Sequence, residues 1–277
     1  MFEIILVFIL GLVLGSFANV CIYRMPRDLS IVRPNSHCTN CNTAIKWYDN
    51  IPVLSYIFLR GKCRKCGSKI SFRYPMVELA CAFLFLLMYY LFGFSCVLIP
   101  FCLFSFSLLV ITVIDFDFQI IPDEISLFLV VLGLGFSFCN TILGDTVLSR
   151  ILNSFFGLLA GGGSLLLIAI IGKWIFGKDA MGGGDIKIMA GVGTFIGWDR
   201  VLFAIFIACF IGGIVGLFMM IFKKIGRKQE IPFGPYLAVA SLLVLFLPSP
   251  EILVGYIFSL EEEFLVKYVF TNLQEVR

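Results

Sequence analysis

Charged residues are scarce in this chain of 277 residues. Asp, Glu, Lys and Arg make up 14% of it and apolar residues 60%, whereas soluble domains carry about 25% charged residues. This composition excludes a soluble globular domain. We expect an all-α, polytopic integral membrane helix bundle whose main partner is the lipid bilayer.

Histidine is also nearly absent, since His37 is the only one in the chain. It lies in a cysteine-rich loop, which excludes a Ser-His or Cys-His nucleophile among the apolar segments. The Asp-Thr/Ser-Gly sequence of soluble aspartic proteases is missing too. The first apolar segment lacks the basic start and the small-residue cleavage site of a signal peptide. We therefore expect residues 1–23 to be a retained transmembrane helix.

Eight apolar segments predict helices that span or enter the bilayer. They cover residues 4–23, 76–92, 96–114, 124–143, 151–171, 186–198, 201–222 and 234–250. The segment 186–198 is too short for a full crossing, so we expect it to tilt or to be shielded by neighbouring helices. Glycine is frequent within and around the fifth to seventh segments, which suits close helix–helix contact.

The distribution of basic residues predicts the topology. Between Arg24 and Pro75 there are ten Lys or Arg residues and two acids, and basic loops stay in the cytoplasm. Alternating the eight segments from this loop puts the N-terminus outside and residues 115–123, 172–185 and 223–233 inside. We expect four parts, namely a first helix (1–23), a cytoplasmic loop (24–75), a transmembrane core (76–250) and a C-terminal tail (251–277).

Four cysteines of the cytoplasmic loop form two C-x-x-C pairs, Cys38 with Cys41 and Cys63 with Cys66. Two such pairs predict a structural zinc site, because two short turns can each supply two sulfurs to a tetrahedral ion. The redox alternative needs one C-x-x-C at a helix start in a thioredoxin-like unit, and that pattern is absent. No aromatic residues alternate with the basic ones of residues 60–67, so we expect no nucleic-acid partner.

Two aspartates, Asp115 and Asp185, lie at the edges of apolar segments. A carboxylate near a bilayer is costly unless it is paired or faces water, so both are functional candidates. Asp185 follows three glycines, Gly182, Gly183 and Gly184, which we expect to form a supporting turn that presents its side chain, because only glycine allows the backbone conformations and the close approach of a tight turn. Two adjacent carboxylates cannot both ionise, so one would act as the acid and the other as the base of a hydrolysis.

Two alternatives remain for these aspartates. They could cap helices at the water boundary, where acids suit the helix dipole. They could also be the coupling carboxylates of an ion-coupled membrane transporter with broken helices. Transporters often carry internal repeats, and no half-to-half similarity is evident in this chain.

Five stretches in this order resemble type IV prepilin peptidases, the membrane aspartic proteases with a Gly-x-Gly-Asp motif. They are residues 15–26, the C-x-x-C pairs, 73–79, 114–123 and 181–187, with a weaker sixth at 231–236. The resemblance implies that Asp115 and Asp185 are catalytic. It also implies that the substrate is a type IV prepilin or pilin-like protein, which loses its basic leader at the cytoplasmic face of the bacterial inner membrane.

The same resemblance implies a second activity. Many members with the long cysteine-bearing loop methylate the new amino terminus with S-adenosylmethionine. Glu78 is our candidate for assisting that step, and its alternative is an ordinary acid near the start of a helix.

Overall fold

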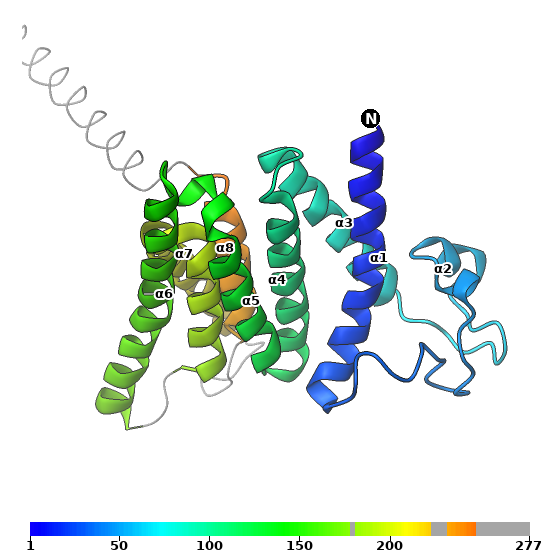
Figure 1. The fold of residues 1–277 in the computed structure, drawn as a ribbon. Coiled ribbons are helices and arrows are strands. Elements are labelled where there is room, and N and C mark those ends of the chain that lie inside the picture. The colour runs from blue at the N-terminus through cyan, green and yellow to red at the C-terminus, as the bar shows by residue number, and fades with distance from the viewer. Residues whose placement is uncertain (178–180, 223–231, 248–277) are drawn as a thin grey trace, which may run out of the picture.

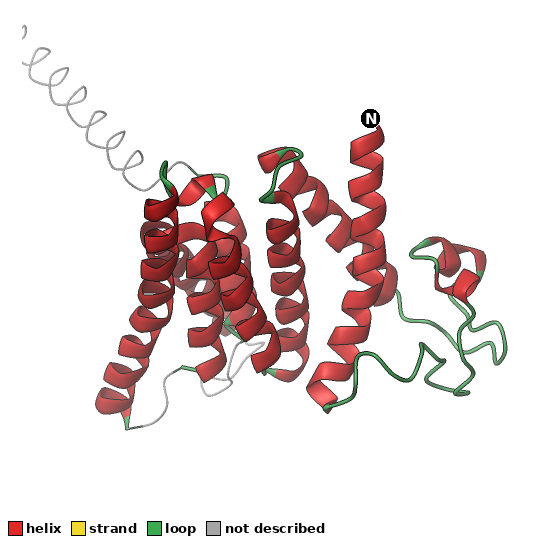
Figure 2. Cartoon of the chain, in the orientation of Figure 1, coloured by secondary structure: helices red, strands yellow, loops and turns green. Residues whose placement is uncertain are grey.

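The computed structural model describes residues 1–177, 181–222 and 232–247. Within these ranges the chain is helical, and its β-structure is limited to two isolated bridges. The predicted all-α fold is confirmed. The helices are α1 (Phe2–Arg24), α2 (Leu54–Phe58), α3 (Arg73–Phe92), α4 (Leu98–Phe118), α5 (Asp123–Phe136), α6 (Val147–Phe176), α7 (Gly183–Ile221) and α8 (Gly234–Val244) (Figures 1 and 2).

All eight predicted apolar segments fall on helices, although some bounds differ. Of the helices described, α1, α3, α4, α6 and α7 are long and apolar enough to cross a membrane. The prediction for 124–143 was too long, because α5 ends at Phe136 and the 3-10 turns Ser137–Cys139 and Thr141–Leu143 follow it. Helix α8 ends at Val244, and the predicted tail (251–277) lies outside the described residues.

Helix α7 contains two of the predicted segments, 186–198 and 201–222, and is interrupted between them. Gly197 has φ 86° and ψ 172°, a conformation that side chains other than glycine's rarely allow. The first part of α7 begins at one end of the bundle, and the second part returns to that end. Asp185 at its start interacts with Asp115, and Gly212 in its second part lies against Tyr236, next to the start of α8.

The first part of α7 is shielded by its neighbours, as predicted for this short segment. Ile188 and Met189 are buried, as is every residue from Gly191 to Gly197. Glycines allow α6 to approach this part closely, because a Cβ at Gly157 would lie 2.0 Å from the Gly193 carbonyl oxygen. Such contact between small residues is typical of packing between membrane helices.

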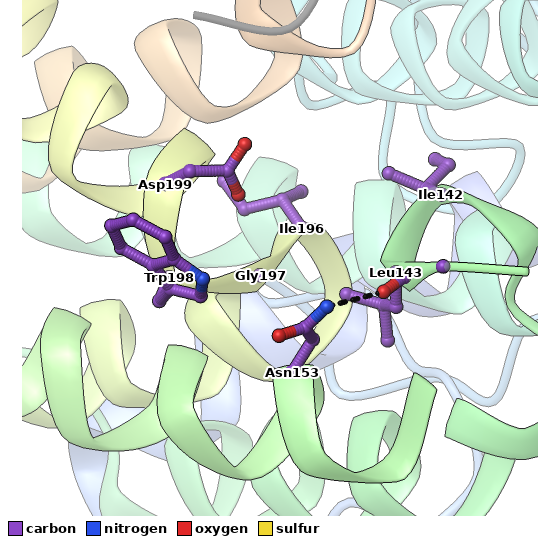
Figure 3. Close-up of a pocket in the computed structure, with 8 residues that line it drawn as sticks. Ile142, Leu143, Asn153, Ile196, Gly197, Trp198 and Asp199 are labelled. Atoms are coloured by element: carbon purple, nitrogen blue, oxygen red, sulfur yellow. Dashed lines mark hydrogen bonds between the residues drawn. The ribbon is translucent and has the colours of Figure 1, made fainter. Parts of the chain in front are cut away.

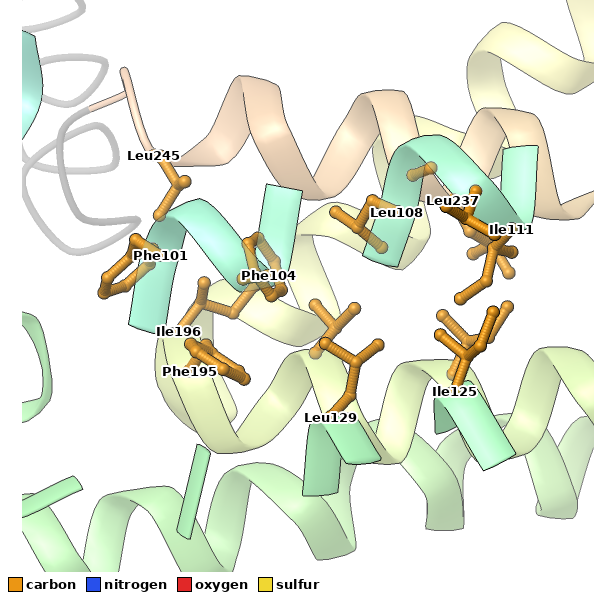
Figure 4. Close-up of a cluster of buried hydrophobic side chains, with 14 of the residues drawn as sticks. Phe101, Phe104, Leu108, Ile111, Ile125, Leu129, Phe195, Ile196, Leu237 and Leu245 are labelled. Carbon is orange, nitrogen blue, oxygen red and sulfur yellow. The ribbon is translucent and has the colours of Figure 1, made fainter. Parts of the chain in front are cut away.

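Helix α4 lies in the middle of the bundle and carries much of its core. Its buried side chains Phe104 and Leu108 face Phe195 of α7, Leu129 of α5 and Leu237 of α8 (Figure 4). The rings of Phe104 and Phe195 lie 4.6 Å apart between centroids. The core therefore fixes the end of α4 relative to the starts of α5, α7 and α8.

Several helix ends and starts gather at one end of the bundle. The ends of α1 and α4 and the starts of α5 and α7 lie in the lower part of Figure 1, and the loop between α1 and α3 leaves from the same end. The loop that carries the cysteines thus starts at the end of the bundle where α4 ends, and its α2 stands beside α1 (Figure 1).

Candidate active site and metal centre

Asp115 lies in the last turn of α4 and is 5% exposed. One of its carboxylate oxygens, Oδ2, accepts a hydrogen bond of 2.9 Å from the backbone N–H of Gly234. Helix α4 ends three residues later, where Gln119 takes a left-handed conformation with φ 55°. The carboxylate is therefore held at a helix end, inside the protein, by the start of a helix from far along the chain.

Asp185 lies in the first turn of α7 and is 8% exposed. It is near enough to Asp115 for the charge of that residue to act on it. The structure thus brings the two predicted aspartates together from separate helices.

The three glycines before Asp185 take ordinary backbone conformations, which corrects one part of the sequence analysis. Gly182 precedes the helix with φ −67° and ψ 136°, and Gly183 and Gly184 are the first helical residues. None of the three has a positive φ. Close packing explains Gly184 better, because a Cβ there would lie 2.7 Å from the Cβ of Ile121.

Two ion pairs near the aspartates were missed by sequence reasoning. Arg73 at the start of α3 contacts Asp117 at 2.5 Å, and Lys187 of α7 contacts Asp123 at the start of α5 at 2.7 Å. The Nη2 atom of Arg73 is buried without a hydrogen-bond partner, alone among the buried side-chain nitrogens and oxygens of the described residues. Charges at helix ends suggested caps in the sequence, and only the fold reveals the pairs.

The four predicted cysteines come together in the loop between α1 and α3. The sulfurs of Cys38, Cys41, Cys63 and Cys66 all lie within 4.8 Å of one another. The two pairs stand on two turns of the same design. Asn42 donates its N–H to the Cys38 carbonyl at 2.8 Å, and Gly67 donates to the Cys63 carbonyl at 2.9 Å. Both turns have a residue with positive φ four residues after the first cysteine, a conformation that Asn and Gly tolerate best.

This cluster fits a zinc ion. Four sulfurs at about 2.3 Å from a tetrahedral ion are separated by about 3.8 Å from one another, and the sulfurs of Cys38 and Cys66 lie 3.8 Å apart. A hydrogen bond with the Ser68 hydroxyl lowers the pKa of the Cys66 thiol to about 6. Backbone N–H groups of Cys41 and Asn40 lower the pKa of Cys38. The environments of Cys38 and Cys66 favour the thiolates that a metal ion needs. At Cys63, by contrast, the backbone N–H of Cys66 lowers the pKa less than desolvation and the neighbouring thiols raise it.

Glu78 is buried on α3, where that helix packs against α1. One carboxylate oxygen accepts the N–H of Val53 at 2.7 Å, and the Ser16 hydroxyl of α1 is a second partner. Val53 precedes α2 with a positive φ of 60°, so this bond holds a strained residue of the cysteine loop. These partners make Glu78 an anchor between the loop and the bundle. Its part in methyl transfer stays a prediction.

Comparison with known proteins identifies the family. Residues 9–92 match the bacterial peptidase A24 N-terminal domain, and residues 102–217 match the type IV leader peptidase family. The chain belongs to the type IV leader peptidase family. It is therefore a peptidase, and the transporter alternative is set aside.

Curated relatives of this leader peptidase cover most of its length. The prepilin leader peptidase/N-methyltransferase of Neisseria gonorrhoeae is 32% identical over 88% of this chain and 90% of its own length. Those of Stutzerimonas stutzeri and Bacillus subtilis (strain 168) are each 34% identical, over 86% of this chain and 88% and 92% of their own lengths. No solved structure matches significantly.

The family matches divide this leader peptidase as the structure does. The first covers most of α1, the cysteine loop and α3, and the second runs from α4 into the second part of α7, with both aspartates. Helix α8 lies beyond the second match, although its first residue, Gly234, bonds Asp115. The family and the long apolar helices together indicate a multi-pass protein of a bacterial membrane.

Proposed function

We propose that Asp115 and Asp185 form the catalytic dyad that removes the basic leader peptide from a type IV prepilin or a pilin-like protein. The observation that carries this proposal is the meeting of two buried carboxyl groups from α4 and α7, 70 positions apart in the sequence by their residue numbers. Both acids lie within the type IV leader peptidase match, Asp115 in the last turn of α4 and Asp185 in the first turn of α7.

The dyad can hydrolyse a peptide bond without a covalent intermediate. The ionised carboxylate takes a proton from water, whose oxygen attacks the carbonyl carbon, while the protonated partner donates to the carbonyl oxygen. The resulting diol collapses with cleavage of the C–N bond, and a proton passes to the leaving amine. Burial of both acids supports this chemistry, because a water-poor site strengthens the interactions that stabilise developing charge.

The position of the dyad suits a substrate that is half in the membrane. The aspartates lie at helix ends, on the side of the bundle from which the basic loop leaves (Figure 1). Basic loops stay in the cytoplasm, so we assign this side to the cytoplasm. The apolar helix of a prepilin would pack among the membrane helices, while its basic leader remains in water within reach of the dyad.

The four-cysteine cluster would hold a structural zinc ion. Its four sulfurs would complete a tetrahedral shell, which leaves no position for a catalytic water. The metal would fix the two C-x-x-C turns relative to each other, and Glu78 would fix the loop to α1 and α3 through Val53. The loop thereby becomes a rigid neighbour of the bundle.

Methylation of the new amino terminus by S-adenosylmethionine would follow cleavage. The names of the curated relatives include this activity. Within this chain, Glu78 fits the role of holding the loop through Val53 and Ser16, rather than one of direct contact with S-adenosylmethionine. We therefore propose that its part in methyl transfer is indirect.

A single assay tests both activities. The purified protein is incubated with a model prepilin that has a basic leader before an apolar helix, with and without S-adenosylmethionine, and the products are weighed by mass spectrometry. We expect leader release in both samples and one added methyl group only with S-adenosylmethionine. An intact substrate in both samples would contradict the peptidase assignment, and an unmethylated product would contradict the transferase.

A further inference from the structure

The start of α8 makes a contact with Asp115 that sequence patterns do not reveal. Gly234 is the first residue of α8, and Pro235 follows it. The N–H groups of Tyr236 and Leu237 both bond the Phe233 carbonyl. Since proline has no N–H, the Gly234 N–H is the one donor of the first two helical positions, and it points to Oδ2 of Asp115.

Glycine also keeps this contact close. A Cβ at residue 234 would lie 2.7 Å from Oδ2 of Asp115, so the carboxyl group would have to move away from its present position. The backbone of α8 therefore reaches the carboxyl group directly. Close approach of the backbone to a functional group is a common reason for glycine at a fixed position.

The two acids differ in whether a backbone N–H donates to their carboxyl groups. The hydrogen bonds among the described residues include one from a backbone N–H to Asp115 and none to the carboxyl group of Asp185. The other charged groups near Asp115 are Asp185 itself and Asp117, which is paired with Arg73 of α3. The described part of α8 carries no charged side chain, so its contribution to the site is its backbone N–H and its dipole.

We infer that Gly234 is a positioning residue that holds Asp115 in its ionised form, so that Asp115 is the base that activates water and Asp185 is the acid. An N–H donor stabilises the carboxylate more than the protonated acid, and the positive end of the α8 dipole acts in the same direction. The inference rests on the proposed dyad and goes beyond it, because it divides the two roles.

The test removes the N–H donor of Gly234, and it also turns the Phe233 carbonyl, which accepts from Tyr236 and Leu237, into an ester carbonyl. Cell-free synthesis into lipid nanodiscs with glycolic acid at position 234 replaces the N–H by an ester oxygen and adds no atom. We expect kcat/KM for a model prepilin to fall about 10- to 100-fold, as for loss of one bond to a charged group. We also expect the acid limb of the pH–rate profile to move to higher pH, because the ionised form of Asp115 loses its donor.

The variant Gly234→Ala gives a second measurement with a matched control. The added methyl group should displace Asp115 and lower cleavage further, whereas Gly213→Ala in α7, where a Cβ would meet no atom within 4 Å, should keep wild-type activity. The control shares the residue change and a helical setting, so it reports the cost of alanine alone.

The outcomes separate this inference from the proposed function. An ester variant with the wild-type rate and pH profile would overturn the role of Gly234, as would a lower rate with an unmoved profile. Cleavage by Asp115→Asn or Asp185→Asn would instead overturn the dyad itself. Inactive asparagine variants together with a shifted ester variant are the result that we expect.

Discussion

The two ends of the helix bundle differ in how many of their polar groups are hydrogen-bonded. At one end the break of α7 at Gly197 frees backbone carbonyls, and side chains satisfy them. Asn140 donates to the Phe195 carbonyl at 2.7 Å, and Ser154 donates to the Thr194 carbonyl at 2.8 Å. In the adjacent pocket, Asn153 bonds the Leu143 carbonyl at 2.6 Å (Figure 3).

The other end, with Asp115 and Asp185, leaves hydrogen-bonding capacity unused. Asp115 accepts one backbone N–H, and among the described residues Asp185 has no hydrogen bond to its carboxyl group. The buried Nη2 of Arg73 has no partner there either. Buried polar groups are normally satisfied, and this Nη2 is the one exception among the buried side-chain nitrogens and oxygens of the described residues. The comparison teaches that helix ends closed by side chains support the fold, whereas those left open support the reaction.

Removal of either dyad carboxylate should have the largest effect. Asp115→Asn and Asp185→Asn should each abolish leader cleavage, because an amide can neither take the proton from water nor share one. The loss should be several orders of magnitude, since acid–base catalysis alone contributes about 10²–10⁴-fold. Single-turnover assays of the purified variants would measure it.

The neighbouring variant Asp117→Asn is the matched control for the dyad. It removes a carboxylate two residues away that pairs with Arg73, and its effect should be much milder. Substantial turnover in either dyad variant, or an equal loss in Asp117→Asn, would remove the distinction between the two ends of the bundle.

Loss of a cysteine should affect the loop more than the chemistry. The purified protein should carry about one zinc ion per chain. Cys63→Ser should lower the metal content and make the loop sensitive to protease, with cleavage impaired only secondarily. Cys209→Ser, an exposed cysteine of α7 outside the cluster, is the control. Metal-free protein with four freely alkylated thiols, prepared without chelator, would disprove the zinc site.

A substitution at the end of the bundle around the break at Gly197 should lower stability and leave catalysis unchanged. Asn140 is 4% exposed, and its side chain satisfies a carbonyl next to the break of α7. Asn140→Ala should lower the free energy of unfolding by about 1–3 kcal/mol, the cost of a buried group left unsatisfied. Thermal unfolding in detergent measures this, with the exposed Asp145→Ala as control. A large fall in kcat without a fall in stability would contradict the structural role.

The sequence predicts residues whose chemistry is unusual for their setting. Asp115 and Asp185 are recognisable because carboxylates are rare beside apolar segments, and the cysteines because their spacing is that of metal ligands. The contact of Gly234 with Asp115 joins residues 119 positions apart, and no local pattern encodes it. The separate segments 186–198 and 201–222 predicted a break close to Gly197, and only the fold shows that this glycine makes it inside one merged helix.

The end of α5 shows a second limit of pattern analysis. Apolar residues recur in 137–143 between the polar Ser137, Asn140 and Thr141, and Leu143 is buried, although the chain there forms 3-10 turns. The predicted helix was therefore too long because it followed apolar residues, which can also be buried in 3-10 turns. The glycines before Asp185 show the same limit. The sequence indicates that glycine is needed there, but the close contact of Gly184 with Ile121 is visible only in the fold.

The smallest effect should come from the ion pair between Lys187 and Asp123 at the dyad end. It joins the first turns of α7 and α5, with contacts of 2.7 and 2.8 Å, so it could orient Asp185. Both side chains are largely exposed, at 53% and 70%, and exposed pairs contribute about 0–1 kcal/mol. Lys187→Ala should thus lower cleavage only a few-fold, and less at high salt.

The neighbouring Glu124→Gln separates this pair from a general charge effect, because it removes an adjacent acid of α5 and leaves the contact intact. A double-mutant cycle of Lys187→Ala with Asp123→Asn then isolates the pair itself. A coupling that changes cleavage by orders of magnitude would mean that the pair belongs to the reacting site. A small coupling would mean that the orientation of Asp185 comes from the packing at the start of α7, where Gly184 meets Ile121 of the loop before α5.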